Sequence, residues 1–138
     1  MIEFNYTTDF RLIDESILSE WIAEVIQELG FELGDIMYHF CDDEALYKLN
    51  VEFLNHDTYT DIISFDYTMG KQIHGEIYIS VDRVKENAHT YAQTFENELN
   101  RVMIHGILHY CGFKDETELE QKNMRAKEDW SLSRLTVD

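Results

Sequence analysis

Two histidines four residues apart, His105 and His109, are the side chains of this chain best placed to do chemistry. On an α-helix this spacing puts both imidazoles on one face, one turn apart. Two neutral imidazoles in this arrangement can share one metal ion at roughly 2.0–2.1 Å each, which is a geometry typical of zinc. Helices without a metal also carry histidine pairs at this spacing, so the pair alone leaves a purely structural role open.

Asp115 follows His105 by ten residues and could supply a third ligand. Gly112 stands where the helix would end, because glycine tolerates the left-handed conformation of a C-terminal cap, and the chain can then turn back. Three protein ligands leave one position of a tetrahedral ion open, as a catalytic metal requires. Glu116 and Glu118 are rival donors with longer side chains. The two histidines and Asp115 are the predicted catalytic and metal-binding residues, and one divalent ion, zinc, is the predicted cofactor.

The pattern His-x3-His-x2-Gly-x2-ligand resembles the layout of the zincin metallopeptidases, but Gly106 stands where their catalytic glutamate would be. A glycine inside a helix costs about 1 kcal/mol relative to alanine, so we expect a packing reason for it. A metallopeptidase therefore remains an alternative function, disfavoured by the missing glutamate.

The segment 105–113 reads His-Gly-Ile-Leu-His-Tyr-Cys-Gly-Phe, and this pattern resembles the YbeY family of bacterial endoribonucleases and rRNA maturation factors. Upstream, Leu49-Asn50, the block Thr-Asp-Ile-Ile-Ser-Phe at 60–65 and the block Gly-Glu-Ile-Tyr-Ile-Ser at 75–80 are similar to family blocks in the same order. The sequence departs from the family pattern at four positions: Asp115 replaces a third histidine, Lys114 an aspartate, Tyr59 a proline and Leu54 an arginine.

The resemblance implies a metal-dependent, single-strand-specific endoribonuclease that acts in processing of the 16S rRNA 3' end and in ribosome maturation. A metal at the site would lower the pKa of a bound water toward about 7 and polarise a phosphoryl oxygen, so that water attacks an RNA phosphodiester. The implied partners are an rRNA precursor and the ribosome or its small subunit, in the cytoplasm. Leu54 at the arginine position keeps a third class open, a ribosome-associated factor that binds without cutting.

Four further polar residues are predicted to bind substrate: Asp61, Ser64, His74 and Lys114. Asp61 and Ser64 belong to the 60–65 block, although capping of the backbone at a strand start explains them equally well. His74 begins a strand that the resemblance places near the cleft, and histidine is the side chain most readily tuned for proton transfer. Lys114 could contact a substrate phosphate from the rim of the site.

The net charge of −17, from 11 Lys and Arg against 28 Asp and Glu, opposes RNA binding at long range. A local basic patch, the metal or a partner must offset this repulsion. The composition otherwise fits one globular domain over residues 1–138, since 44% of the residues are hydrophobic and no stretch approaches the 18 apolar residues of a membrane span. Cys41 and Cys111 are expected to be small buried hydrophobes in a reducing cytoplasm.

Apolar alternation predicts strands at 2–6, 36–41, 61–67 and 73–80. Helical spacing predicts helices after Asp14 up to Gly30 and at 43–53, 82–94, 95–111 and 117–133. Leu119, Met124 and Trp130 are expected to anchor the last of these helices. This order of elements predicts an α+β fold with a small mixed sheet of about four strands covered by helices. The family resemblance implies the same kind of architecture, that of a zincin-like metal hydrolase.

Overall fold

A four-stranded mixed sheet forms the framework of the protein, whose computed structural model describes residues 1–56 and 59–135. The strands run in the order β1-β2-β4-β3 across the sheet. The first three in this order are parallel to one another, and β3 pairs with β4 in the antiparallel direction. Their bounds are β1 Ile2–Tyr6, β2 Glu32–Cys41, β3 Ile62–Asp66 and β4 Gln72–Ser80. The predicted mixed sheet and α+β class are confirmed.

Five helices lie between and after these strands in the described residues: α1 Glu15–Glu28, α2 Asp43–Leu54, α3 Val81–Thr90, α4 Phe95–Tyr110 and α5 Glu118–Ser133. Side-chain caps set their starts, as when the Thr94 hydroxyl accepts the backbone N–H of Asn97 at 3.1 Å. The predicted helix 82–94 ends early, at Thr90, because Ala92 adopts a left-handed φ of 53°. The described residues contain no helix that qualifies as a membrane span by length and hydropathy.

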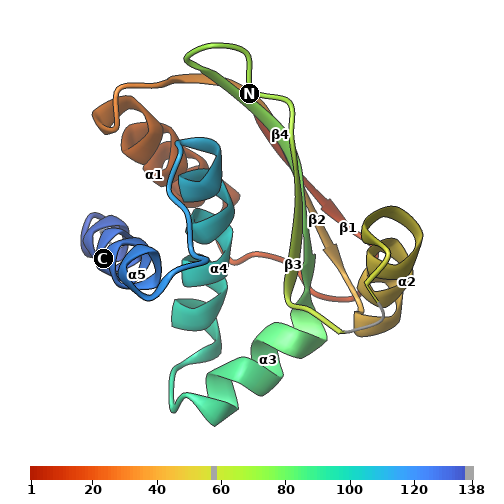
Figure 1. The fold of residues 1–138 in the computed structure, drawn as a ribbon. Helices are drawn as coiled ribbons and strands as arrows, with labels where there is room; N and C mark the ends of the chain where they lie inside the picture. The colour runs from red at the N-terminus through yellow and green to blue at the C-terminus, as the bar shows by residue number, and fades with distance from the viewer. Residues whose placement is uncertain (57–58, 136–138) are drawn as a thin grey trace.

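The helices divide unequally between the two faces of the sheet. Figure 1 shows α1, α4 and α5 on one side and α2 on the other. Residues of β4 alternate between these faces, so Ile73 and Ile77 join the main core while Tyr78 packs with the smaller cluster beneath α2. Helix α4 is buried nearly all round, between the sheet and α5. The histidine-bearing helix therefore lies at the centre of the molecule.

Glycine allows α4 to approach the sheet closely. A Cβ on Gly106 would lie 3.0 Å from the Cδ1 of Ile77 and 3.3 Å from the Cδ1 of Ile62. This explains why a helix accepts a glycine at a cost of about 1 kcal/mol. The position of the zincin glutamate thus faces the sheet in this protein.

A second glycine, Gly75 on β4, makes room for the ring of Tyr110 at the end of α4. A Cβ there would lie 2.5 Å from the Tyr110 ring. The Tyr110 hydroxyl donates to the backbone oxygens of Phe65 and Glu76 at 2.9 and 3.1 Å, so this contact joins α4 to both β3 and β4. This fit sets how far the histidine-bearing helix α4 lies along the sheet.

We expect Gly75→Ala to destabilise the protein by about 2 kcal/mol, since overpacking a filled site forces neighbours to move. Urea denaturation measures the change. In a Tyr110→Ala background the same substitution should cost much less, because the clashing ring is gone. Equal costs in the two backgrounds would show that the clash with Tyr110 is not the cause.

Candidate metal centre

The two histidines project from the last two turns of α4. Their ring centroids are 4.5 Å apart, and both side chains are partly exposed. After Cys111 the helix closes with two backbone hydrogen bonds, from Gly112 N to His109 O and from Phe113 N to Leu108 O, both at 3.0 Å. Gly112 has a φ of 96°, so this is a Schellman-type C-cap. The cap reverses the chain and returns Asp115 toward the histidines.

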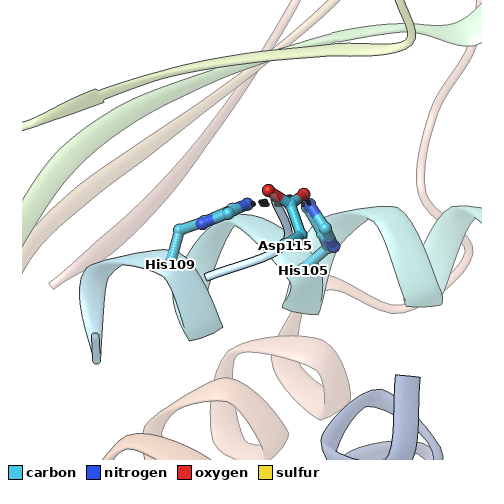
Figure 2. Close-up of side chains that lie close together, drawn as sticks. All are labelled: His105, His109 and Asp115. Atoms are coloured by element: carbon cyan, nitrogen blue, oxygen red, sulfur yellow. Dashed lines mark hydrogen bonds and ion pairs between the residues drawn. The ribbon is translucent and has the colours of Figure 1, made fainter. Parts of the chain in front are cut away.

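Three potential ligand atoms meet at one point. The Nε2 atoms of His105 and His109 are 3.0 Å apart, and the Asp115 Oδ2 lies 3.3 Å from the first and 3.2 Å from the second. Figure 2 shows the carboxylate between the two imidazoles. A tetrahedral zinc ion with ligands at about 2.0–2.1 Å would hold them roughly 3.3 Å apart, close to the spacing found.

The donor set fits a divalent transition metal. Imidazole nitrogen and carboxylate oxygen are both ordinary zinc ligands. Within the described residues, His105, His109 and Asp115 are the group of side chains with this arrangement, and the rival donors Glu116 and Glu118 do not belong to it. The structure thus brings together the three residues that the sequence indicated, and the group could hold a metal ion.

A partly buried ion-pair network lies next to His105. The Nδ1 of His105 lies 2.6 Å from Oε2 of Glu128, and Arg101 donates to the other oxygen of Glu128 at 2.9 Å and to Asp129 at 2.7 Å. Burial opposes ionisation of Glu128, but the hydrogen bonds from His105 and Arg101 outweigh it and lower the pKa of Glu128. Burial would lower the pKa of His105, but the hydrogen bond to Glu128 and the surrounding carboxylates raise it.

Sequence reasoning did not find Glu128 or Arg101 as parts of the site. Glu128 lies 23 residues after His105 on a different helix, so no local spacing connects them. Arg101 precedes His105 by one helical turn, which places it on the histidine face of α4. That spacing was the one feature of the sequence that could have linked Arg101 to the site. It was not sufficient, because the contact also depends on a carboxylate from α5.

A cavity of about 230 Å³ opens beside His105. Three carboxylates and two arginines line it, along with His105 and two apolar side chains: Asp61, Glu98, Glu128, Arg101, Arg125, Ile62 and Val102. Burial raises the pKa of Asp61, and the charge of His105 and a hydrogen bond from Asn87 at 3.4 Å offset this only in part. Asp61 is therefore a half-buried carboxyl group that lines the same cavity as His105.

We expect Asp61→Asn to stabilise the protein at pH 7 by about 1 kcal/mol, since it removes a half-buried negative charge whose ionisation burial disfavours. The pKa of Asp61 is raised in the folded state, so its contribution to stability is lost as pH rises through that value. The gain from asparagine should therefore become small at pH 3.5, where the carboxyl is mostly protonated in both states. Urea denaturation at pH 7 and pH 3.5 measures this, and a loss of stability at pH 7 would contradict it.

The other predicted substrate residues lie in different places. Ser64 lies on β3 close to the hydroxyl of Tyr110, on the α4 side of the sheet. His74 lies on the opposite face, where its Nδ1 accepts the backbone N–H of Asp35 at 3.0 Å. Lys114 is exposed and lines a hollow with Phe113 and residues of α5. The structure therefore places Asp61 beside His105 and Ser64 beside Tyr110, and it places His74 on the far face of the sheet.

Comparison with known proteins finds relatives that match nearly the whole chain. The family model described as endoribonuclease YbeY matches residues 3–136. Endoribonuclease YbeY of Flavobacterium johnsoniae is 51% identical over 138 residues, covering 100% of this chain and 99% of that protein. The protein of the same name from Flavobacterium psychrophilum is 52% identical over 137 residues, covering 99% and 98%.

A solved structure shows the same fold. The solution structure of a Thermotoga maritima protein superimposes with a TM-score of 0.69 at 27% identity, covering 98% of this chain and 89% of that one. Since the family model spans nearly the whole chain and full-length relatives share half of its residues, the chain belongs to the endoribonuclease YbeY family.

Proposed function

We propose that this protein is a metal-dependent endoribonuclease that cuts single-stranded RNA during processing of the 16S rRNA 3' end. Membership of the endoribonuclease YbeY family supports the nuclease role. The observation that carries the metal dependence is the meeting of His105 Nε2, His109 Nε2 and Asp115 Oδ2 within 3.3 Å of one another. An rRNA precursor and the small ribosomal subunit are the proposed partners, and the cytoplasm is the proposed location.

Each residue of the site has a distinct proposed task. His105, His109 and Asp115 would hold the ion, zinc in our proposal. A bound zinc ion would supply Lewis acidity, lowering the pKa of water and polarising a phosphoryl oxygen. Asp61 and Ser64 are the proposed substrate contacts on the same side of the sheet. Lys114 could reach RNA from the rim, and His74 could do so only if the RNA passed around the edge of the sheet.

The strong negative charge of the protein shapes how RNA must bind. With a formal net charge of −17, the chain gains little from long-range attraction to a polyanion. Near the site, Arg101 is committed to Glu128 and Asp129, whereas no hydrogen bond or ion pair holds Arg125 among the described residues. The ion and Arg125 are thus the proposed local sources of positive charge. We expect RNA binding to depend less steeply on salt than in a basic nuclease.

The test uses protein purified without a metal-affinity tag and a labelled RNA that carries a hairpin and a single-stranded 3' extension. Zinc-loaded wild type should cut the extension, and chelator or His109→Ala should abolish cutting. Cleavage that survives both treatments would overturn the metal-dependent mechanism. Casein serves as a second substrate, because proteolysis without RNA cleavage would identify a metallopeptidase. Binding to small ribosomal subunits that chelator does not affect, with no cleavage, would identify a non-catalytic ribosome-associated factor. This is the alternative suggested by Leu54 at the position of the family arginine.

A further inference from the structure

We propose that Glu128, held in place by Arg101, is the positioning residue that makes His105 a metal ligand. This inference rests on the proposed metal-dependent function. The three side chains form a continuous series, which we call the Arg101–Glu128–His105 chain, with contacts of 2.9 Å and 2.6 Å. Carboxylates behind ligating histidines fix the ring and its tautomer in metalloproteins. Here the arrangement comes from two helices that are distant in sequence.

The first step of the argument concerns the proton on His105. A carboxylate can only accept hydrogen bonds, so the Nδ1 that lies 2.6 Å from Glu128 must be the donor. In a neutral ring the proton on Nδ1 leaves Nε2 bare. That Nε2 is the atom that lies 3.0 Å from His109 and 3.3 Å from Asp115. Glu128 therefore aims a free lone pair into the ligand group.

The second step concerns the charge of Glu128. Its side chain is only 7% exposed, and a buried carboxylate needs partners for both oxygens. Arg101, itself 13% exposed, donates to one oxygen, and His105 donates to the other. Neither oxygen is left without a partner. Arg101 thus keeps Glu128 charged and oriented, and Glu128 in turn orients His105.

The third step concerns helix α5. Glu128 lies on α5, which Met124 and a hydrogen bond from the Trp21 indole to the backbone oxygen of Ser131 at 2.7 Å join to the core. The second ligand, His109, is different, because no carboxylate of the described residues lies at ion-pair distance from its Nδ1. Helix α5 therefore contacts one of the candidate ligands, His105, through Glu128. Because α5 is packed against the core, we infer that the core fixes the orientation of the His105 ring.

Glu128→Gln provides a sharp test because it preserves shape and removes one acceptor. The amide has a single oxygen, so it cannot accept from Arg101 and His105 on its two sides. If the oxygen stays with Arg101, the amide N–H faces His105 Nδ1 and favours the tautomer with the proton on Nε2. That proton occupies the atom that must bind the metal. Zinc affinity should then fall by about 10- to 100-fold.

The matched control is Asp129→Asn. It removes the other ion pair of Arg101 but leaves Glu128 and His105 untouched, so zinc affinity should stay within about twofold of wild type. Affinity is measured by competition with a chromophoric chelator. Imidazole ¹⁵N chemical shifts, recorded on zinc-free protein at a pH where the ring is neutral, report the tautomer of His105. Wild type and the control should carry the proton on Nδ1, whereas Glu128→Gln should shift it toward Nε2.

Two results would overturn the inference. One is a Glu128→Gln protein that binds zinc as tightly as wild type. The other is a wild-type His105 that already carries its proton on Nε2, a measurement that does not depend on any variant folding. Wild-type protein that binds zinc and shows the expected tautomer but cuts no RNA would contradict the proposed nuclease function alone, since neither readout here uses RNA.

Discussion

Replacing His109 with alanine is expected to lower zinc affinity by more than about 100-fold and to reduce RNA cleavage to background. The variant removes one of three converging ligand atoms, whereas loss of an outer partner alone typically costs 10- to 100-fold. Wild-type protein should carry close to one equivalent of transition metal by elemental analysis, and the variant should carry almost none. His89→Ala is the matched control, because His89 is exposed on α3 and belongs to no candidate ligand group of the described residues.

Zinc binding at the same site should also raise the melting temperature of the protein. An ion that binds only the folded state stabilises it by about 2.7 kcal/mol at a hundred times its dissociation constant. For a protein of this size that corresponds to a rise in melting temperature of roughly 8–10 °C. Wild type and His89→Ala should show this rise on addition of zinc, and His109→Ala should not. If the wild-type protein contained no metal and its melting temperature did not change with added zinc, metal binding by the two histidines would be contradicted, and their role would be structural packing.

Local sequence signals were sufficient to predict helix α4, which carries the two histidines of the candidate site. The Thr94 cap, the histidine spacing and the glycine terminator all act within a few residues, and each is present as predicted. The return of Asp115 also follows from a local motif, because a Schellman cap dictates the direction of the next residues. The candidate ligand group was therefore accessible from one short segment of the chain.

It was harder to predict which face of a helix or strand packs against its neighbours. Leu119 was expected to anchor α5 but is 68% exposed, whereas Met124 is 2% exposed. Leu119 sits in the first turn of α5, and the spacing of apolar residues does not reveal where along its length a helix meets its neighbour. His74 shows the same difficulty in a strand, because alternation gives two faces without saying which one carries the site helix.

Contacts between distant segments could not be predicted at all. The hydrogen bond from His105 to Glu128 joins α4 to α5, and the close approach of Gly106 depends on isoleucines of β3 and β4. The sequence could indicate only that a glycine at position 106, inside a helix, must have a packing role. Long-range pairs of this kind become visible when the helices have been docked, since a single sequence contains no signal for them.

Asp115 carries the second large effect, because it stands where the family pattern has a histidine. Asp115→Ala should lower zinc affinity by about 100-fold and abolish metal-dependent cleavage, since an open fourth position needs three protein ligands behind it. Glu116→Ala is the matched control one residue away. Glu116 is exposed and lies outside the ligand group, so its loss should leave both affinity and cleavage nearly unchanged.

Asp115→His separates coordination from charge. It should retain zinc and cleavage by supplying a third imidazole, which is a common catalytic ligand set. A carboxylate ligand adds negative charge and weakens the Lewis acidity of the ion, so the histidine variant should reach full activity at a lower pH than wild type. The comparison uses cleavage rates from pH 5 to pH 9 with zinc in excess. An Asp115→Ala protein that binds zinc as tightly as wild type would refute the role of this carboxylate, and an unchanged pH profile in Asp115→His would refute the effect of its charge.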